Sequence, residues 1–151
     1  MADSCNYNIH VRGGKAECLM LYAAMPCDDS KDFLLAEGTE ENFVLHFEGS
    51  CKWGLDAYCK EEFAGIIDVS KYRNVDLDSE DFDVYELEDD GLPYWYITMR
   101  KKSELLNVEI LALAWSDEYY GVDHYKNGIL LSSDGDGYDE DEGLPEIEFA
   151  F

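Results

Sequence analysis

Basic residues are scarce in this sequence: 11 lysines and arginines stand against 35 aspartates and glutamates, which gives a formal net charge of −24 over 151 residues. The shortage makes direct nucleic-acid binding unfavourable, because contacts to phosphates depend on Lys and Arg. A surplus of one charge also makes a folded domain repel itself. A solubilising or halophile-like surface is one explanation, but solubility needs only a modest net charge. We therefore expect the carboxylates to recognise a positively charged partner.

The signals of disulfide-rich, zinc-binding and membrane-spanning proteins are also missing. The five cysteines are odd in number and contain no C-x-x-C motif, so we expect reduced, buried thiols. The apolar run Leu19 to Met25 is too short to cross a bilayer. Since no secretory signal pattern is found either, the expectation is a cytoplasmic protein without membrane contact.

Catalytic and metal-binding patterns are equally weak. His10 and His46 are the best acid–base candidates, because both fall on polar faces of predicted strands, yet no nucleophile or glycine-rich phosphate loop accompanies them. The acidic run from Asp134 places Asp139 and Pro145 where a calcium loop of the EF-hand type needs glycine and glutamate. We expect no catalytic residue, no dedicated metal site and no cofactor.

The sequence does contain enough apolar residues for a core. Hydrophobic residues make up 46% of the chain and aromatic residues 14%, which is too many for a disordered acidic chain. The length suits a single domain over residues 1–151. Alternation of apolar and polar residues predicts a strand over Asn6 to Arg12. Helical spacing predicts a helix from Lys15 to Met25, ended by Pro26 and followed by a polar stretch to Glu41.

The second half of the chain continues this mixture of strands and helices. Its predicted elements are a β-hairpin from Asn42 to Tyr58 that turns at Gly49-Ser50, a lead-in and helix from Pro93 to Asn107, a central strand from Val108 to Trp115 and a hairpin around Asn127-Gly128. The order predicts an α+β fold with one antiparallel sheet and helices on one face. It is the ferredoxin-like order, with an acidic insertion at 60–93, an acidic loop at 133–146 and a C-terminal β-hairpin.

Several short motifs sharpen this expectation. They are Asn6-Tyr7-Asn8-Ile9-His10-Val11, Cys51-Lys52-Trp53, Ser103 to Ile110, Trp115-Ser116-Asp117-Glu118 and His124 to Gly128. Together they resemble the YubB ferredoxin-like family of small accessory proteins carried by phages, plasmids and related elements. The family's usual Ser-Glu-Pro-Gly turn is replaced by Ser116-Asp117-Glu118-Tyr119. The resemblance implies a fold and a mobile-element origin, and it transfers no catalytic residue.

Two acidic tracts carry the strongest functional signal, and tyrosines interleave with both. Carboxylates and aromatic rings together suit Arg and Lys through ion pairs and cation–π contacts. Carboxylates spaced along a folded surface can also imitate duplex DNA, which has about one negative charge per 1.7 Å of axis. The predicted partner-binding residues are Asp76, Asp78, Glu80, Asp81, Asp83, Tyr85, Glu86, Glu88, Asp89 and Asp90 in the first tract, and Asp134, Asp136, Tyr138, Asp139, Glu140, Asp141 and Glu142 in the second.

Three functions are compatible with these features. The first is a phage or mobile-element anti-defence protein, in the host cytoplasm, that inhibits a basic nucleic-acid-binding host protein, such as a CRISPR effector or restriction enzyme, by mimicking DNA or RNA. The second is an acidic adaptor or assembly module that binds through an edge strand or a hydrophobic patch, with a homodimer as one form. The third is a small-ligand-binding protein or enzyme that uses the open face of the sheet.

Overall fold

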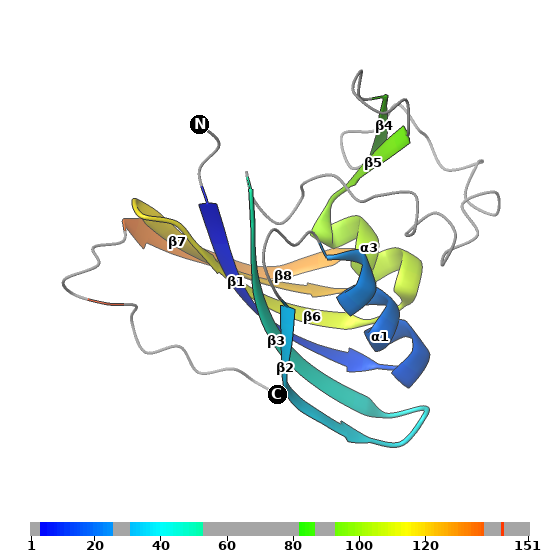
Figure 1. The fold of residues 1–151 in the computed structure, drawn as a ribbon. Helices are drawn as coiled ribbons and strands as arrows, with labels where there is room; N and C mark the ends of the chain where they lie inside the picture. The colour runs from blue at the N-terminus through cyan, green and yellow to red at the C-terminus, as the bar shows by residue number, and fades with distance from the viewer. Residues whose placement is uncertain (1–3, 26–30, 53–81, 87–92, 138–142, 144–151) are drawn as a thin grey trace.

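The computed structural model describes residues 4–25, 31–52, 82–86, 93–137 and 143 (Figure 1). The elements in these ranges are β1 (Ser4–Gly13), α1 (Lys15–Ala24), β2 (Lys31–Gly38), β3 (Phe43–Lys52), β4 (Phe82–Glu86), β5 (Pro93–Ile97), α3 (Met99–Leu106), β6 (Glu109–Trp115), β7 (Tyr119–Lys126) and β8 (Ile129–Gly137). Six strands form one sheet in the order β2-β3-β1-β6-β7-β8, and β4 pairs with β5 in a separate two-stranded sheet.

Every described strand pair is antiparallel, and β1 lies at the centre between β3 and β6. Helices α1 and α3 contact each other on one face of the six-stranded sheet, where α1 covers β1 and β3 and α3 lies over β7 (Figure 1). The predicted α+β class, with an antiparallel sheet and helices on one face, is confirmed. Neither described helix has the length and apolar composition required to cross a lipid bilayer.

The hydrophobic core lies between the sheet and the two helices. Tyr7, Ile9 and Val11 alternate along β1 and are fully buried, as the apolar alternation predicts. The other buried members of this core come from α1, β3, α3 and β6 and from residues next to them, and are Cys18, Leu21, Met25, Phe43, Leu45, Phe47, Cys51, Met99, Leu106, Val108, Ile110 and Ala112. Burial of these side chains, at about 25 cal/mol for each Å² of apolar surface, is the main force that holds the helices on this face.

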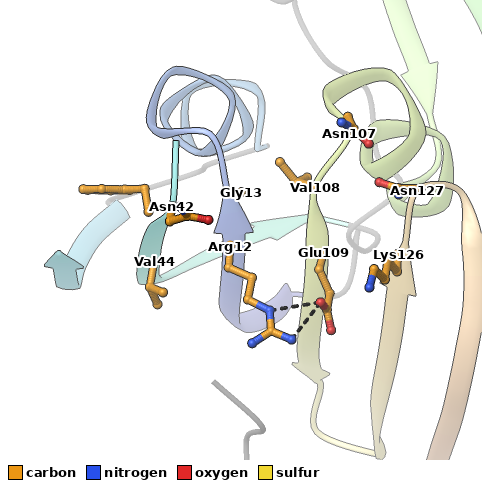
Figure 2. A pocket seen from close by; sticks show the side chains of 10 residues that line it. Arg12, Gly13, Asn42, Val44, Asn107, Val108, Glu109, Lys126 and Asn127 are labelled. Carbon is orange, nitrogen blue, oxygen red and sulfur yellow. Dashed lines mark hydrogen bonds and ion pairs between the residues drawn. The ribbon is translucent and has the colours of Figure 1, made fainter. Parts of the chain in front are cut away.

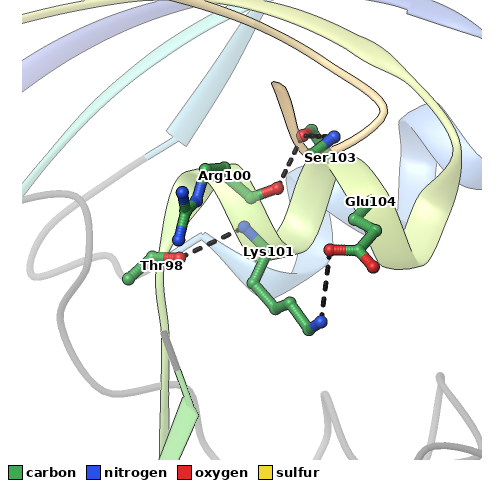
Figure 3. Close-up of polar contacts among 6 residues, drawn as sticks. Thr98, Arg100, Lys101, Ser103 and Glu104 are labelled. Atoms are coloured by element: carbon green, nitrogen blue, oxygen red, sulfur yellow. Dashed lines mark hydrogen bonds and ion pairs between the residues drawn. The ribbon is translucent and has the colours of Figure 1, made fainter. Parts of the chain in front are cut away.

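Helix α3 has a capping residue at each end, and Figure 3 shows the contacts of its first half. The Thr98 hydroxyl accepts a hydrogen bond from the Lys101 amide at 3.1 Å, which satisfies one of the otherwise orphaned amides of the first turn. Asn107 ends the helix in the left-handed conformation. The Ser103 hydroxyl accepts the Gly128 amide at 2.9 Å, so the helix is tied to the turn between β7 and β8.

The predicted hairpin from Asn42 to Tyr58 is wrong in the described part, because β3 runs through Gly49 and Ser50 without turning. Gly49 lies directly opposite Tyr7 in the β1–β3 register. A Cβ atom at this position would lie 2.5 Å from the Tyr7 hydroxyl oxygen. The glycine therefore provides room for a buried tyrosine ring instead of a turn.

Two strands and the end of a third also differ from the sequence-based expectation. The polar stretch before Glu41 contains β2, whose pairing with β3 shifts register between Phe33 and Leu35. The lead-in to α3 is strand β5. The first five residues of the predicted acidic loop at 133–146 belong to β8, which ends at Gly137. The predicted hairpin at Asn127-Gly128 is confirmed, and both residues have the positive φ angles that this turn requires.

Candidate functional site

The face of the sheet opposite α1 and α3, here called the helix-free face, carries polar side chains mixed with apolar ones. Cross-strand registers place His46, His10, Leu111 and His124 in one row across β3, β1, β6 and β7. All three histidines of the chain therefore lie in a single row. The row beside it contains Val44, Arg12, Glu109 and Lys126, and the row on the other side contains Glu48, Asn8, Leu113 and Val122.

His10 and His46 are stacked, with ring centroids 3.6 Å apart and an angle of 12° between the rings. The structure thus brings together the pair that the sequence singled out as acid–base candidates. His10 is buried although no described helix covers this face. The side-chain oxygen of Asn8, which precedes His10 on the same face of β1, is buried and accepts no hydrogen bond among the described residues. The stacked pair lies on two neighbouring inner strands of the sheet, β1 and β3.

Glu109 joins two of these rows through its carboxylate, and Figure 2 shows its contacts with Arg12. Its Oε1 atom accepts the Arg12 Nε at 3.0 Å and the Arg12 Nη2 at 2.9 Å, and its Oε2 atom lies 2.6 Å from the His124 Nε2. Burial acts to raise the pKa of Glu109, but the hydrogen bonds and positive charges of His124 and Arg12 outweigh it, so that the pKa is lowered. Glu109 is therefore a buried, ionised anchor of the helix-free face.

A hollow of about 390 Å³ opens beside this anchor, where β1 and β7 end and β6 begins. Arg12, Glu109 and Lys126 project on the same side of it (Figure 2). Lys126 forms no ion pair within the described part of the chain. Arg12 is exposed too, but its charge is paired with Glu109, so this wall gives little basis for binding a strongly anionic ligand in a molecule of net charge −24.

A second hollow, here called the acidic hollow, is lined by Asn6, Tyr7, Asp32, Glu48, Gly49, Ser50 and Trp115 and measures about 280 Å³. Asp32 and Glu48 are direct cross-strand partners in the β2–β3 register. Like charges in this position destabilise a sheet. Neither carboxylate forms an ion pair with a described residue. Lys31, the neighbour of Asp32, instead donates to the carbonyls of Tyr22 at 2.7 Å and Met25 at 3.3 Å.

The acidic hollow has the chemistry of a receptor for a cationic side chain. The carboxylates of Asp32 and Glu48 supply charge, Trp115 supplies an aromatic ring, and Asn6 and Ser50 supply polar groups beside them. A guanidinium group pairs with carboxylates through parallel hydrogen bonds and also stacks on aromatic rings. Within the described ranges, no group of three or more His, Cys, Asp or Glu side chains is placed to hold a metal ion.

The structure describes five of the predicted partner-binding residues. Asp134 and Asp136 are exposed on the edge strand β8, where each carboxylate accepts the amide of the following glycine, at 2.9 and 2.7 Å. Asp83, Tyr85 and Glu86 lie in β4, which belongs to the other sheet. The remaining twelve lie outside the described residues: Asp76, Asp78, Glu80, Asp81, Glu88, Asp89, Asp90, Tyr138, Asp139, Glu140, Asp141 and Glu142.

Sequence reasoning missed the acidic hollow because it missed β2. Asp32 fell in a stretch regarded as irregular, and neither Glu48 nor Trp115 belongs to an acidic tract. A signal was present: Phe33, Leu34 and Leu35 form a short apolar run that ends before a glycine, which is compatible with a strand. Pairing of that strand with the next one would have placed Asp32 near Glu48.

Both outer strands of the sheet expose apolar side chains. On β2, Phe33 is half-exposed but stacks on Tyr22 with ring centroids 4.3 Å apart. On β8, every residue is exposed, and this includes the consecutive residues Ile129, Leu130 and Leu131. Strand β8 contains no lysine or proline, the residues that commonly protect an edge strand from pairing with another chain.

Comparisons with known proteins identified no relative of this chain. No family model matches the chain, and neither a curated protein nor a solved structure matches it significantly.

Proposed function

We propose that this chain is an acidic binding protein that occupies a cationic surface on a nucleic-acid-binding protein and so competes with the nucleic acid. The candidate partners are the basic nucleases of host defence, namely CRISPR effectors and restriction enzymes. In this proposal the chain acts in the cytoplasm of the host and performs no catalysis. Carboxylates take the place of phosphates in a channel lined by Lys and Arg, and long-range attraction accelerates the encounter.

The observation that carries the proposal is the Asp32–Glu48 pair beside Trp115, which has no ion-pair partner among the described residues. Two carboxylates that face each other across a strand pair, without a described cation, lower the stability of the free protein. Such a cost is typical of binding sites, where it is recovered when the partner arrives. An arginine side chain of the partner that enters the acidic hollow would remove the repulsion and stack on the indole.

The remaining charge of the described residues points the same way. Among their acidic residues, only Glu104 and Glu109 form ion pairs with described basic groups. Exposed carboxylates on β2 and β8, such as Glu37, Asp134 and Asp136, are therefore available to a partner. A surface of this kind attracts a basic protein over about 8 Å at physiological salt.

We further infer that the fold is a ferredoxin-like sheet with two additions, and that the chain is a mobile-element protein related to the YubB family. The succession β1, α1, β2, β3, α3 and β6, with the sheet order β2-β3-β1-β6, supports a split β-α-β arrangement. The β4–β5 pair would then be part of the acidic insertion at 60–93. The β7–β8 hairpin would extend the sheet beyond β6.

The test is a binding titration against nucleic-acid-free CRISPR effectors and restriction endonucleases at low and high NaCl concentrations. We expect tight binding that weakens with salt and that duplex DNA or guide RNA displaces. The double variant D32N/E48Q should bind at least about tenfold more weakly. The matched control E40Q/E41Q removes the same charge from the exposed β2–β3 turn and should bind nearly as tightly as the unmodified chain.

Two results would reject the proposal. One is an absence of binding to every basic nuclease of the panel at low salt. The other is binding that neither salt nor nucleic acid weakens. A block variant in which Asp134, Asp136, Asp139 and Glu140–Glu142 become Asn and Gln separates the second tract from the acidic hollow. Full binding by this variant and by D32N/E48Q would exclude the second tract and the acidic hollow as the contact, and would leave the first tract, residues 76–90, as the candidate.

The exposed aliphatic residues of β8 favour a second candidate function, an adaptor that pairs its edge strand with an extended segment of the partner. In β-strand addition, backbone hydrogen bonds provide the affinity and side-chain pockets provide the specificity. The charge-neutral variant Leu130→Ser with Leu131→Ser distinguishes the two functions. Binding that is lost in this variant but retained in D32N/E48Q would assign the interaction to the edge strand.

A further inference from the structure

Two cysteines from distant parts of the chain lie directly opposite each other. Cys5 and Cys51 are cross-strand partners in the β1–β3 register, next to the Asn6–Ser50 pair. Cys51 is buried in the core and Cys5 packs against the same core while keeping some exposure, so both side chains lie on the helix-covered face. The two residues are not joined by a disulfide in this structure.

The backbone geometry of such a pair is compatible with a disulfide bond. Directly opposite residues of antiparallel strands have Cα atoms about 4.5–5.5 Å apart. A disulfide accepts Cα separations of about 4.4–6.8 Å. The strands therefore need no rearrangement for the two sulfur atoms to bond, and only the side-chain rotamers have to adjust.

We propose that Cys5 and Cys51 form a reversible disulfide bond that fastens the start of β1 to the end of β3. The oxidant is a low-molecular-weight disulfide of the glutathione class. This site is independent of the proposed binding function, because it involves neither the acidic hollow nor the acidic tracts.

The reaction is thiol–disulfide exchange in two steps. The partly exposed Cys5 thiolate attacks the small disulfide, forms a mixed disulfide and releases one small thiolate. Cys51 then loses its proton and attacks the Cys5 sulfur, which forms the protein disulfide and releases the second small thiol. The small disulfide gains the two electrons that the two cysteines lose, and their two protons end on the released thiols.

The local environment favours Cys5 as the attacking group. A hydrogen bond with the Cys51 side chain lowers the pKa of Cys5 and outweighs burial, which acts to raise it. Cys18 is the contrast within the same core. Burial, together with the neighbouring Glu17, raises the pKa of Cys18 to about 12, so its thiol stays protonated and inert. Cys27 and Cys59 lie outside the described residues.

The test treats the reduced, full-length protein with 2-hydroxyethyl disulfide, a neutral reagent that the negative charge of the protein does not repel. Tryptic cleavage without reduction then separates the cysteines: Cys5 falls in 1–12, Cys18 and Cys27 in 16–31, Cys51 in 32–52 and Cys59 in 53–60. Mass spectrometry should find 1–12 joined to 32–52 as the first product. A reducing agent should restore both peptides.

Variants complete the test. Cys5→Ser should abolish the cross-link, whereas Cys18→Ser, if it folds, should leave it unchanged. The oxidised protein should melt at a higher temperature than the reduced protein, because the bond closes a long loop in the unfolded chain. The proposal is wrong if Cys5 and Cys51 remain thiols or single adducts of the reagent while other cysteines oxidise. The peptide map of the unmodified chain decides this even if the Cys18 variant does not fold.

Discussion

The two faces of the central sheet are built from the same strands but have opposite chemistry. On β1, Tyr7, Ile9 and Val11 face the helices and are fully buried. The alternate residues His10 and Arg12 face the other way, where one stacks on His46 and the other binds Glu109. The helix-covered face gains its free energy from apolar burial. On the helix-free face the like-charged Asp32–Glu48 pair costs stability, and this cost makes the face the better candidate for recognition.

The largest effect should come from the helix-covered face. Ile110 is fully buried there, and Ile110→Ala should lower the free energy of unfolding by about 2–5 kcal/mol, because it removes buried methyl groups and leaves a cavity. The matched control is Val122→Ala on the helix-free face, where the side chain is only half-buried. Urea denaturation measures both variants. Equal losses of unfolding free energy would contradict the inference that the helix-covered face provides most of the stability.

Glu109 lies on the helix-free face but stabilises the protein, because its buried carboxylate is hydrogen-bonded to Arg12 and His124. Glu109→Gln should cost about 1–3 kcal/mol by weakening charged hydrogen bonds to Arg12 and His124. Because folding lowers the pKa of Glu109, its contribution is present above the unfolded pKa of about 4.3 and is lost as pH falls through the folded value. The difference in unfolding free energy between the two proteins should therefore shrink under acidic conditions. A difference that grows with acidity would show that the pKa is raised.

The contribution of the N-terminal cap of α3 to stability can be tested at Thr98. Thr98→Ala should lower the free energy of unfolding by about 1 kcal/mol, because the Lys101 amide loses its capping oxygen. Thr98→Ser keeps the hydroxyl and should recover most of the loss. Thermal denaturation followed by circular dichroism compares the two variants. If they were equally unstable, packing of the threonine methyl group would be responsible instead of the cap.

The smallest effect has the opposite sign. D32N/E48Q should raise the free energy of unfolding by about 0.2–1 kcal/mol, because it removes a like-charge cross-strand pair. Added salt should raise the melting temperature of the unmodified chain, because it screens the repulsion between carboxylates: the Debye length falls from about 10 Å at 0.1 M to about 3 Å at 1 M. The variant should respond less to salt than the unmodified chain does. A loss of stability would mean that the two carboxylates hold the local structure together.

Local patterns were sufficient for several elements of the fold. The alternation over Asn6 to Arg12, the helical spacing from Lys15 and the β-compatible run from Val108 each predicted an element at the right place. The Asn127-Gly128 pair predicted its hairpin, because few residues other than Asn and Gly accept two successive positive φ angles. In each case the information lies within a dozen consecutive residues.

The misread elements depend on contacts between distant residues. Gly49 has the composition of a turn, and only the Tyr7 ring on the opposing strand shows why it sits inside β3. Strand β2 does not alternate cleanly, because its register shifts between Phe33 and Leu35 and most of its side chains are exposed at the edge. Such a strand is recognisable mainly through the partner with which it pairs.

Composition alone determined that the protein is acidic and has enough apolar residues for a core, because charge and apolar content are sums over residues that do not depend on their arrangement. Tertiary structure decided which of these residues meet. It placed Asp32 opposite Glu48 beside Trp115, Cys5 opposite Cys51, and the three histidines in one row. Strand register determines which residues lie opposite each other, and register results from the simultaneous burial of one face of all the strands.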